Sequence, residues 1–543
     1  AQTARVQIIH NSPDPAADTV NIFADNSPLL TDVAFQEASP FIDVPAGSPI
    51  DISVLPQGVT DTAQAVFKTP VTFTVNDTFV VVADGIVNTA NFATSNTFNL
   101  EVSAGAREQA ANTGDVDILV HHGSPDAPGV DVVEVGQSAG TIINNLAYPN
   151  FTGYASFAPL DYILQVKDST QSVDVGEYLA PLQTLNLADS ALVLVASGVL
   201  NRFDNPGAPF ELLAVLPNGS VIKLPATTSK SQIIHNVADP AASTVDVWIN
   251  DEKAIPNFSF RTATPYLDLP ANTDLTISLT GPNSSDTSGA LLTQTLNIPR
   301  DSAFTVIASG VSNNPNFDSI KPLSLQAAPA FTQAPNSGET AVQVFHGATD
   351  AGSVSVDETT VPVPGLVSNL SYGQFNGYLN LNTQDYELDL LSNVTNSLVA
   401  QYEAPLQTLG LTDSSIVVLA SGFLDTAKGI ANLPELGLYA ALPAGGPLVP
   451  LPVISGIGLE SPGMAGLEIY PNPSDERVNL RWEKASLESI QLMDMTGRTV
   501  KQIGSIKGQE KVQIDVSDLP GGVYMIQMIE KGEILGTFKL QVL

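Results

Sequence analysis

The sequence predicts an all-β protein made of four tandem immunoglobulin-like β-sandwich modules and a small C-terminal β-sandwich. Three observations lead to this prediction: a repeat of about 110 residues, period-two alternation of apolar and polar residues, and frequent turn signals. No long apolar stripe at helical spacing competes with them. The 543 residues are therefore expected to form five domains, at residues 1–108, 115–226, 230–328, 340–452 and 467–543.

Histidines mark the repeat. Four of the five histidines are separated by 112, 113 and 111 residues, and each ends an apolar stretch and precedes an aspartate by four residues. The pairs are His10 and Asp14, His122 and Asp126, His235 and Asp239, and His346 and Asp350. At 73 or 74 residues beyond each histidine, a second apolar run ends in Ala-Asp-Gly or Ala-Ser-Gly. Two landmarks at a fixed separation identify four copies of one module.

Every second copy of the module shares additional segments. Copies one and three share the segments 41–46 and 266–271, whereas copies two and four share 180–185 and 404–409. We infer that the unit duplicated last was a pair of modules.

Each module is expected to begin with the strand that ends at its histidine and to continue, after a loop, with alternating residues. The later apolar runs, 79–83, 192–196, 304–308 and 416–420, predict central strands of a sandwich because both of their faces are apolar. A hairpin is expected where 213–217 and 221–224 flank Asn218-Gly219. Short linkers between modules of like charge favour an extended rod in which every module packs a core of its own.

The charge distribution separates the body from the tail. The first 463 residues carry 12 Lys and Arg against 45 Asp and Glu, whereas the last 80 carry 9 against 11. All five methionines also lie in the tail. So acidic a body repels phosphate backbones, which excludes nucleic acid as a partner, and it attracts divalent cations such as calcium. Cysteine is absent, so neither disulfides nor thiolate metal sites stabilise the fold.

No apolar run reaches the roughly 20 residues that cross a bilayer, so no transmembrane segment is expected. The first residue is Ala1, which fits either a trimmed chain or the removal of a signal peptide.

The repeated His and Asp leave three interpretations open. A carboxylate can orient an imidazole for proton transfer, but Ser12 and Ser124 are replaced by Val237 and Ala348, so no nucleophile accompanies every pair. One imidazole and one carboxylate are also too few ligands for a metal ion. The structural interpretation, in which the histidine bonds to its loop and the aspartate caps a turn, is preferred, and no catalytic or cofactor-binding residue is predicted.

The tail carries motifs in a characteristic order: Tyr470-Pro471-Asn472-Pro473, Asp494 with Gly497, Gly522 with Tyr524, and Lys539. This arrangement resembles the C-terminal sorting domain of type IX secretion substrates. The resemblance implies a small β-sandwich that an outer-membrane translocon recognises, and therefore a protein secreted or held on the outer face of a Gram-negative outer membrane.

The four modules resemble tandem bacterial extracellular domains of unknown function, whose members open with a similar His-x-Ser-Pro-Asp loop. Modules three and four depart from that loop, with Val237-Ala238 and Ala348-Thr349 in place of Ser-Pro. The resemblance implies an extracellular location and no particular activity.

Together these features predict a non-enzymatic structural or adhesive surface protein, such as a fibre or matrix subunit that associates with itself. Two alternatives stay open. One is a glycan-binding module in which exposed aromatic residues such as Tyr154, Tyr378 or Trp248 stack on sugars, and the other is a secreted hydrolase.

Overall fold

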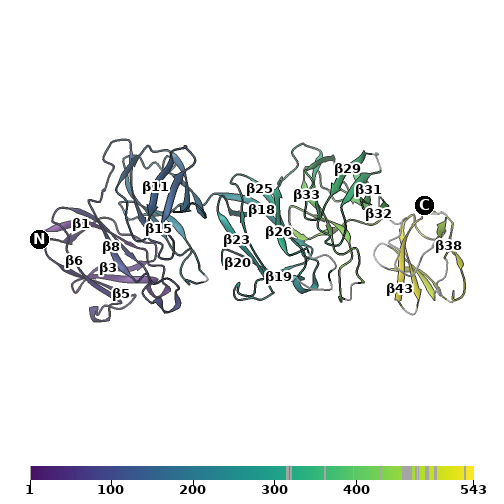
Figure 1. Cartoon of the computed structure of the whole chain (residues 1–543), viewed down its shortest axis with the longest axis horizontal. Coiled ribbons are helices and arrows are strands. Elements are labelled where there is room, and N and C mark those ends of the chain that lie inside the picture. Colours follow the sequence, from purple (N-terminus) through teal and green to yellow (C-terminus); the bar gives the residue numbers. More distant parts are fainter. Residues whose placement is uncertain are drawn as a thin grey trace.

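The computed structural model describes residues 2–454 except 203, 313–316, 318–320, 360–362, 395, 396, 428 and 429. In the tail it describes residues 468–470, 474, 476–482, 488–494, 498–504, 506–530 and 533–542. The described chain is almost entirely β, with four short 3-10 helices, which confirms the predicted class and the sandwich modules. Figure 1 shows the modules in sequence order along an elongated molecule, with the N-terminus at one end and the tail at the other.

Module 1 packs two four-stranded sheets, of order β4-β1-β7-β8 and β3-β2-β5-β6. Its strands are β1 (Thr3–His10), β2 (Thr19–Ala24), β3 (Ser27–Ala34), β4 (Ile42–Pro45), β5 (Ile50–Pro56), β6 (Phe67–Val71), β7 (Thr78–Asp84) and β8 (Asn99–Ala104). The 3-10 helices are η1 (Pro15–Ala17), η2 (Thr62–Gln64) and η3 (Thr89–Asn91). The strand that ends at His10 and the strand that ends at Asp84 are parallel neighbours, so the two sequence landmarks meet at one end of the sandwich.

Module 2 has the sheets β12-β9-β15-β16-β17 and β11-β10-β13-β14. Its strands are β9 (Val116–His122), β10 (Val130–Glu134), β11 (Gly140–Leu146), β12 (Ala155–Phe157), β13 (Asp161–Asp168), β14 (Asp174–Pro181), β15 (Ala191–Ser197), β16 (Glu211–Val215) and β17 (Val221–Lys223). Strands β16 and β17 form the hairpin predicted around Asn218-Gly219, where Gly219 has a φ of 87°.

Module 3 has the sheets β26-β25-β18-β21, with β22 also paired to β18, and β20-β19-β23-β24. Its elements are β18 (Thr228–Asn236), η4 (Pro240–Ala242), β19 (Thr244–Ile249), β20 (Glu252–Ser259), β21 (Thr262–Ala263), β22 (Leu267–Pro270), β23 (Asp274–Thr280), β24 (Leu292–Asn297), β25 (Ala303–Ser309) and β26 (Ser324–Pro329).

Module 4 has the sheets β30-β27-β33-β34-β36 and β29-β28-β31-β32. Its strands are β27 (Glu339–His346), β28 (Val354–Glu358), β29 (Val363–Leu370), β30 (Leu379–Asn382), β31 (Asp385–Ser392), β32 (Ser397–Pro405), β33 (Ser415–Ser421), β34 (Gly437–Ala441), β35 (Gly446–Pro447) and β36 (Val449–Pro450). Strand β35 pairs with β21 and so extends a sheet of module 3.

Each module packs a core of its own, as expected, but the modules do not pack independently of each other. In module 1, Val6, Ile8 and Val81 face the core of their own sandwich, while Ile9, Val80 and Val82 join residues of module 2 in a second cluster. The module 2 side of this cluster is Leu119, Val193, Val195, Leu213 and Val215. Strands β7 and β15 are central, as predicted, but their second apolar face is buried because two modules dock on each other.

Modules 3 and 4 form a second pair in the same way. Their shared cluster joins Ile234 and Ile307 of module 3 to Phe345, Val417 and Leu419 of module 4. The structural unit is therefore the pair of modules, the same unit that the alternating sequence similarity indicates.

A polar junction joins the two pairs. Glu177 of module 2 is 1% exposed, and its Oε2 atom lies 2.7 Å from Arg300 Nη1 of module 3. The Nδ2 atom of Asn272, also in module 3, donates to both oxygens of Glu177 at 3.0 Å. Nearby, Asn297 Nδ2 donates to Asp174 Oδ2 at 3.0 Å. The two pairs are thus joined by charge-assisted hydrogen bonds around a buried carboxylate, which are among the stronger polar contacts in proteins.

The tail packs a core of its own around Trp482, which is 2% exposed. Its sheets have the orders β37-β38-β41 and β40-β39-β42-β43. The strands are β37 (Glu468–Tyr470), β38 (Arg477–Arg481), β39 (Ser489–Asp494), β40 (Thr499–Gly504), β41 (Lys511–Asp515), β42 (Gly522–Glu530) and β43 (Glu533–Val542).

Candidate functional site

The repeated histidines lie at the ends of β1, β9, β18 and β27 and are at most 1% exposed. Each Nε2 atom donates to a backbone carbonyl six or seven residues further along the chain. The pairs are His10 with Ala17 O at 2.6 Å, His122 with Pro128 O at 2.9 Å, His235 with Ala242 O at 2.9 Å, and His346 with Gly352 O at 2.8 Å. The imidazole thereby closes the loop that follows its own strand.

The repeated aspartates connect that loop to the one after the Ala-Asp-Gly or Ala-Ser-Gly tripeptide. Asp14 Oδ2 accepts from Asn88 N at 2.7 Å, and Asp239 Oδ2 accepts from Ser312 N at 2.7 Å. In the even modules both carboxylate oxygens accept from this second loop. Asp126 binds Leu200 N and Asn201 N, each at 2.9 Å, and Asp350 binds Leu424 N at 2.8 Å and Asp425 N at 2.9 Å.

Burial disfavours the charged form of each imidazole. It lowers the pKa of His10, His122 and His346, and it lowers the pKa of His235 to about 4. In each case the hydrogen bond to the carbonyl opposes this effect without cancelling it. These groups are therefore neutral at pH 7, and the neutral tautomer that carries its proton on Nε2 is the one that suits the carbonyl acceptor.

The geometry offers little to catalysis or to metal binding. Ser12 Oγ donates to Gly85 O at 2.6 Å, and both Ser12 and Ser124 are 0% exposed. Among the residues that the structure describes, no three His, Asp or Glu side chains converge where they could hold a metal ion. The hydrogen bonds of the histidine and the aspartate instead hold two loops at one end of each sandwich.

The tripeptide glycines turn the chain sharply, as the sequence indicates. Gly85 has a φ of 81°, and a Cβ atom there would lie 2.4 Å from Thr97 O. Gly198 has a φ of 85°, and a Cβ atom there would lie 2.0 Å from Pro209 O. Only glycine combines this backbone conformation with so close a neighbour.

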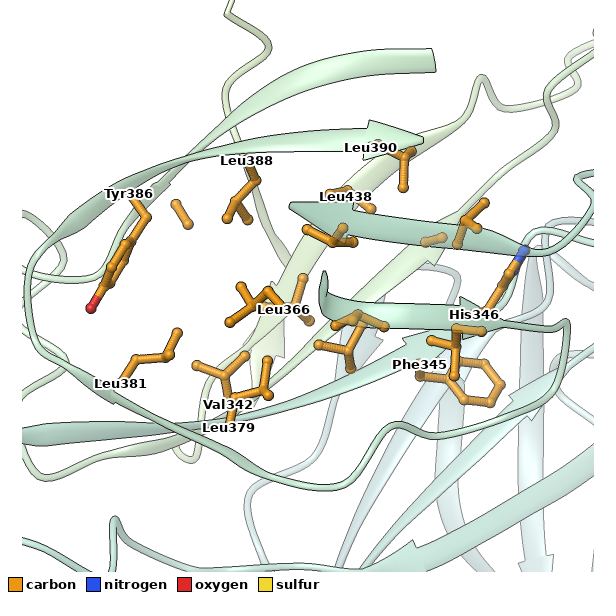
Figure 2. A pocket seen from close by; sticks show the side chains of 18 of the residues that line it. Val342, Phe345, His346, Leu366, Leu379, Leu381, Tyr386, Leu388, Leu390 and Leu438 are labelled. Carbon is orange, nitrogen blue, oxygen red and sulfur yellow. The ribbon is translucent and has the colours of Figure 1, made fainter. Parts of the chain in front are cut away.

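The even modules enclose apolar cavities between their sheets. Module 2 has one of about 160 Å³ whose lining includes Ile118, Ile142 and Leu164, and module 4 has one of about 50 Å³ at the equivalent place. In Figure 2, Val342, Leu366 and Leu388 project into the module 4 cavity, while Tyr386 and His346 lie at its opposite ends. These linings are largely apolar, with His346 and Tyr386 in module 4 and Glu134, Thr152 and Tyr162 in module 2 as their polar members.

One titratable pair was missed by reasoning from sequence. His121 Nε2 lies 2.9 Å from Asp84 Oδ2, and both side chains are 0% exposed between modules 1 and 2. Burial raises the pKa of Asp84, although its hydrogen bond with His121 opposes the shift. A signal existed: His121 is the one histidine out of register, and Asp84 is the one aspartate among tripeptides that otherwise contain serine.

The aromatic residues proposed as sugar platforms are engaged in packing. Trp248 is 7% exposed, and its Nε1 atom donates to Thr280 Oγ1 at 3.0 Å, so the expectation that it is exposed is wrong. Tyr154 and Tyr378 are half-buried, and their hydroxyl oxygens accept from Arg107 N at 3.1 Å and Phe331 N at 3.0 Å.

The structure places several residues of the sorting motif. Tyr470 ends β37 and is 50% exposed, and Gly522 begins β42. Tyr524 is 6% exposed, donates to Pro520 O at 2.8 Å, and stands opposite Asp494 in the sheet register. Lys539 stands opposite Met525 in β43. Pro471, Asn472, Pro473 and Gly497 lie outside the described residues.

Comparison with protein families agrees with both resemblances. Residues 4–111 and 230–357 match a domain of unknown function, DUF4397, and residues 468–541 match the secretion system C-terminal sorting domain. The chain thus carries DUF4397 repeats and a type IX sorting domain, and it is a secreted or cell-surface protein. None of the described helices is both long and apolar enough to cross a membrane.

No curated protein matches the sequence. Among solved structures, the Bacillus anthracis TIE protein has 7% identity over 82% of this chain and 68% of its own, with a TM-score of 0.12. The BSP domain of a biofilm associated protein has 10% identity over 90% of this chain and 99% of its own, with a TM-score of 0.13.

Proposed function

We propose that this protein is a non-enzymatic structural or adhesive component of the cell surface or extracellular matrix. Two rigid module pairs form its body, and the sorting domain delivers that body through the type IX secretion machinery. Self-association of such bodies would build a fibre or matrix.

The observation that supports this proposal best is the way the modules are joined. Within a pair, the apolar cluster around Ile9 and Val195 makes two sandwiches into one body. Between pairs, the buried Glu177 carboxylate of module 2 contacts Arg300 and Asn272 of module 3. A body whose four modules are joined by such contacts suits the transmission of force or the spacing of two contact points.

The repeated His and Asp support the non-enzymatic part of the proposal. In all four modules the imidazole Nε2 is occupied by a carbonyl, and the carboxylate accepts from backbone N–H groups. We propose that these residues, together with their partners in the loops, are structural. A general base needs an acceptor atom within reach of a substrate proton, whereas these imidazoles are buried and these carboxylates accept from backbone N–H groups of a neighbouring loop.

Electron microscopy of the protein taken from the culture supernatant tests the proposal. Ordered filaments or lateral sheets of uniform rods support it, whereas dispersed monomers at high protein concentration contradict the fibre. Retention on a glycan array would favour the glycan-binding alternative. Turnover of a hydrolase substrate that is lost on His10→Gln and His122→Gln would show an enzyme instead.

A further inference from the structure

The interfaces inside the two pairs share a common frame. Gln7 Nε2 of module 1 donates to Leu216 O of module 2 at 2.7 Å, and Gln232 Nε2 of module 3 donates to Leu442 O of module 4 at 2.7 Å. A Cβ atom on Gly123 would lie 2.2 Å from Asn11 Nδ2, and one on Gly347 would lie 2.0 Å from Asn236 Nδ2. Because the two interfaces share these contacts, module 1 could also dock on module 4, and module 3 on module 2.

The centre of each interface differs, however. Pair one buries the contact between Asp84 and His121 described above. At the equivalent positions of pair two stand Ser309, at the end of β25, and Phe345, which is 0% exposed. The Phe345 side chain packs in an apolar cluster with Ile234 and Ile307 and lies 4.7 Å from the ring of Phe375. Ser309 Oγ lies 3.0 Å from Tyr372 Oη.

Exchange of partners would bring the wrong residues together. If module 1 docked on module 4, the Asp84 carboxylate would face Phe345 in a dry, apolar site. Its donors would be Asn11 Nδ2 and Gly85 N of its own module and the Tyr372 hydroxyl of module 4, which lies beside the Ser309 position, so it would have no imidazole partner. A buried carboxylate that loses its charged or hydrogen-bonding partner is strongly destabilised, whereas one that keeps its partner is tolerated.

We propose that the buried Asp84–His121 contact is a recognition element that makes module 1 accept module 2 and reject module 4. A penalty on the pairing of module 1 with module 4 is sufficient. Module 3 can dock on module 2 only when module 1 has left module 2, and module 1 then has no favourable partner. The same element disfavours dimers in which module 1 of one copy docks on module 4 of another, because that contact lacks the Asp84–His121 pair.

The test makes the two interfaces alike in the full-length protein. The variant Asp84→Ser/His121→Phe gives pair one the residues of pair two, and Ser309→Asp/Phe345→His gives pair two the residues of pair one. After refolding from urea at high protein concentration, light scattering coupled to size exclusion measures the dimer fraction. We expect this fraction to rise at least tenfold over the wild type in both variants.

A matched control inverts the polarity of the contact. Ser309→His/Phe345→Asp would set two carboxylates against each other in one wrong pair and two imidazoles in the other, so its dimer fraction should not exceed that of the wild type. A carboxyl-reactive cross-linker with mass spectrometry should report links between modules 1 and 4 in the first two variants only. Hydrogen exchange of β1 and β9 verifies that the monomers keep the native pair.

Two outcomes would overturn the proposal. One is a dimer fraction that stays at the wild-type value in both matching variants. The other is an equal rise in the polarity-inverted control, which would show that any change at this interface loosens the pairing.

Discussion

Acid should weaken module 3 in a pH range set by His235. Burial lowers the pKa of this imidazole to about 4, whereas in the unfolded chain it is about 6.5. Between these values the unfolded chain binds a proton that the folded chain does not, so the free energy of unfolding falls as pH falls. The contribution of the neutral His235 imidazole to the free energy of unfolding is complete above pH 6.5 and is lost as the pH falls towards 4. Between pH 7.5 and pH 5.0 the loss amounts to about 2 kcal/mol.

The two tryptophans allow this loss to be measured in the full chain. Trp248 lies in β19 of module 3, and the other tryptophan, Trp482, lies in the tail. With Trp482→Phe as background, tryptophan fluorescence follows module 3 alone during urea unfolding. A slope of roughly 1–3 kcal/mol per M urea converts the loss into a midpoint about 1 M lower at pH 5.0 than at pH 7.5.

The variant His235→Gln supplies the control, because glutamine can donate to Ala242 O but does not titrate. It should be less stable at pH 7.5 and should show a smaller shift of the midpoint between the two pH values. Asp251, whose pKa is raised by burial, acts in the opposite direction and is present in both proteins. An unchanged shift in His235→Gln, or an imidazole that titrates near pH 6.5 by NMR, would refute the reasoning.

Three further predictions concern the contacts that hold the loops, the pairs and the body together. Asp126→Ala removes the acceptor for Leu200 N and Asn201 N, so it should destabilise module 2 by about 1–3 kcal/mol and speed hydrogen exchange in residues 198–202. The comparison is Asp161→Ala, which removes an exposed carboxylate at the start of β13 that accepts from Gln183 N and Thr184 N and should leave exchange in residues 198–202 unchanged. Glu177→Ala leaves Arg300 without its buried partner, and small-angle scattering should then show a broader range of angles between the pairs; an unchanged scattering profile would mean that the junction is held by other contacts. Gly123→Ala places a Cβ atom against Asn11 Nδ2 and should lower the melting temperature of pair one, whereas Gly153→Ala, with open space around it, should leave that temperature nearly unchanged; equal effects would contradict the close approach at Gly123.

The sequence predicted the local structure well because period and turn chemistry are local properties. The apolar runs became central strands, and Asn218-Gly219 formed its hairpin. Docking between modules was missed because a strand buried on both faces has the same pattern whether its second face meets a sheet of its own module or of a neighbour. Nothing in the sequence pattern distinguishes Ile9 and Val80, which lie in the interface with module 2, from the apolar residues of the module's own core.

The hydrogen-bond partners of the repeated histidines and aspartates could be predicted only in part, because some partners are near in sequence and others are far away. The repeated histidine was expected to bond to the loop that follows it, and that hydrogen bond exists in every module. The partner of Asp14 lies 74 residues away at Asn88, and it could be found only once the parallel pairing of β1 with β7 was known. The deviation of His121 and Asp84 from their repeats held the most information, since a repeat that is broken at two touching positions points to a contact.

The alternation of module types follows from the same interface. A lone module 1 would expose Ile9, Val80 and Val82 to water, because these side chains are covered by module 2 and not by its own second sheet. Such a face on a free module would favour aggregation, so a duplication that copied one module alone would leave an apolar surface unpaired. A duplication that copied both partners together keeps every such surface covered, but it also creates a second, equally shaped partner for each module. The divergence of the Asp84 and His121 positions from Ser309 and Phe345 would then remove the ambiguity that this duplication introduced.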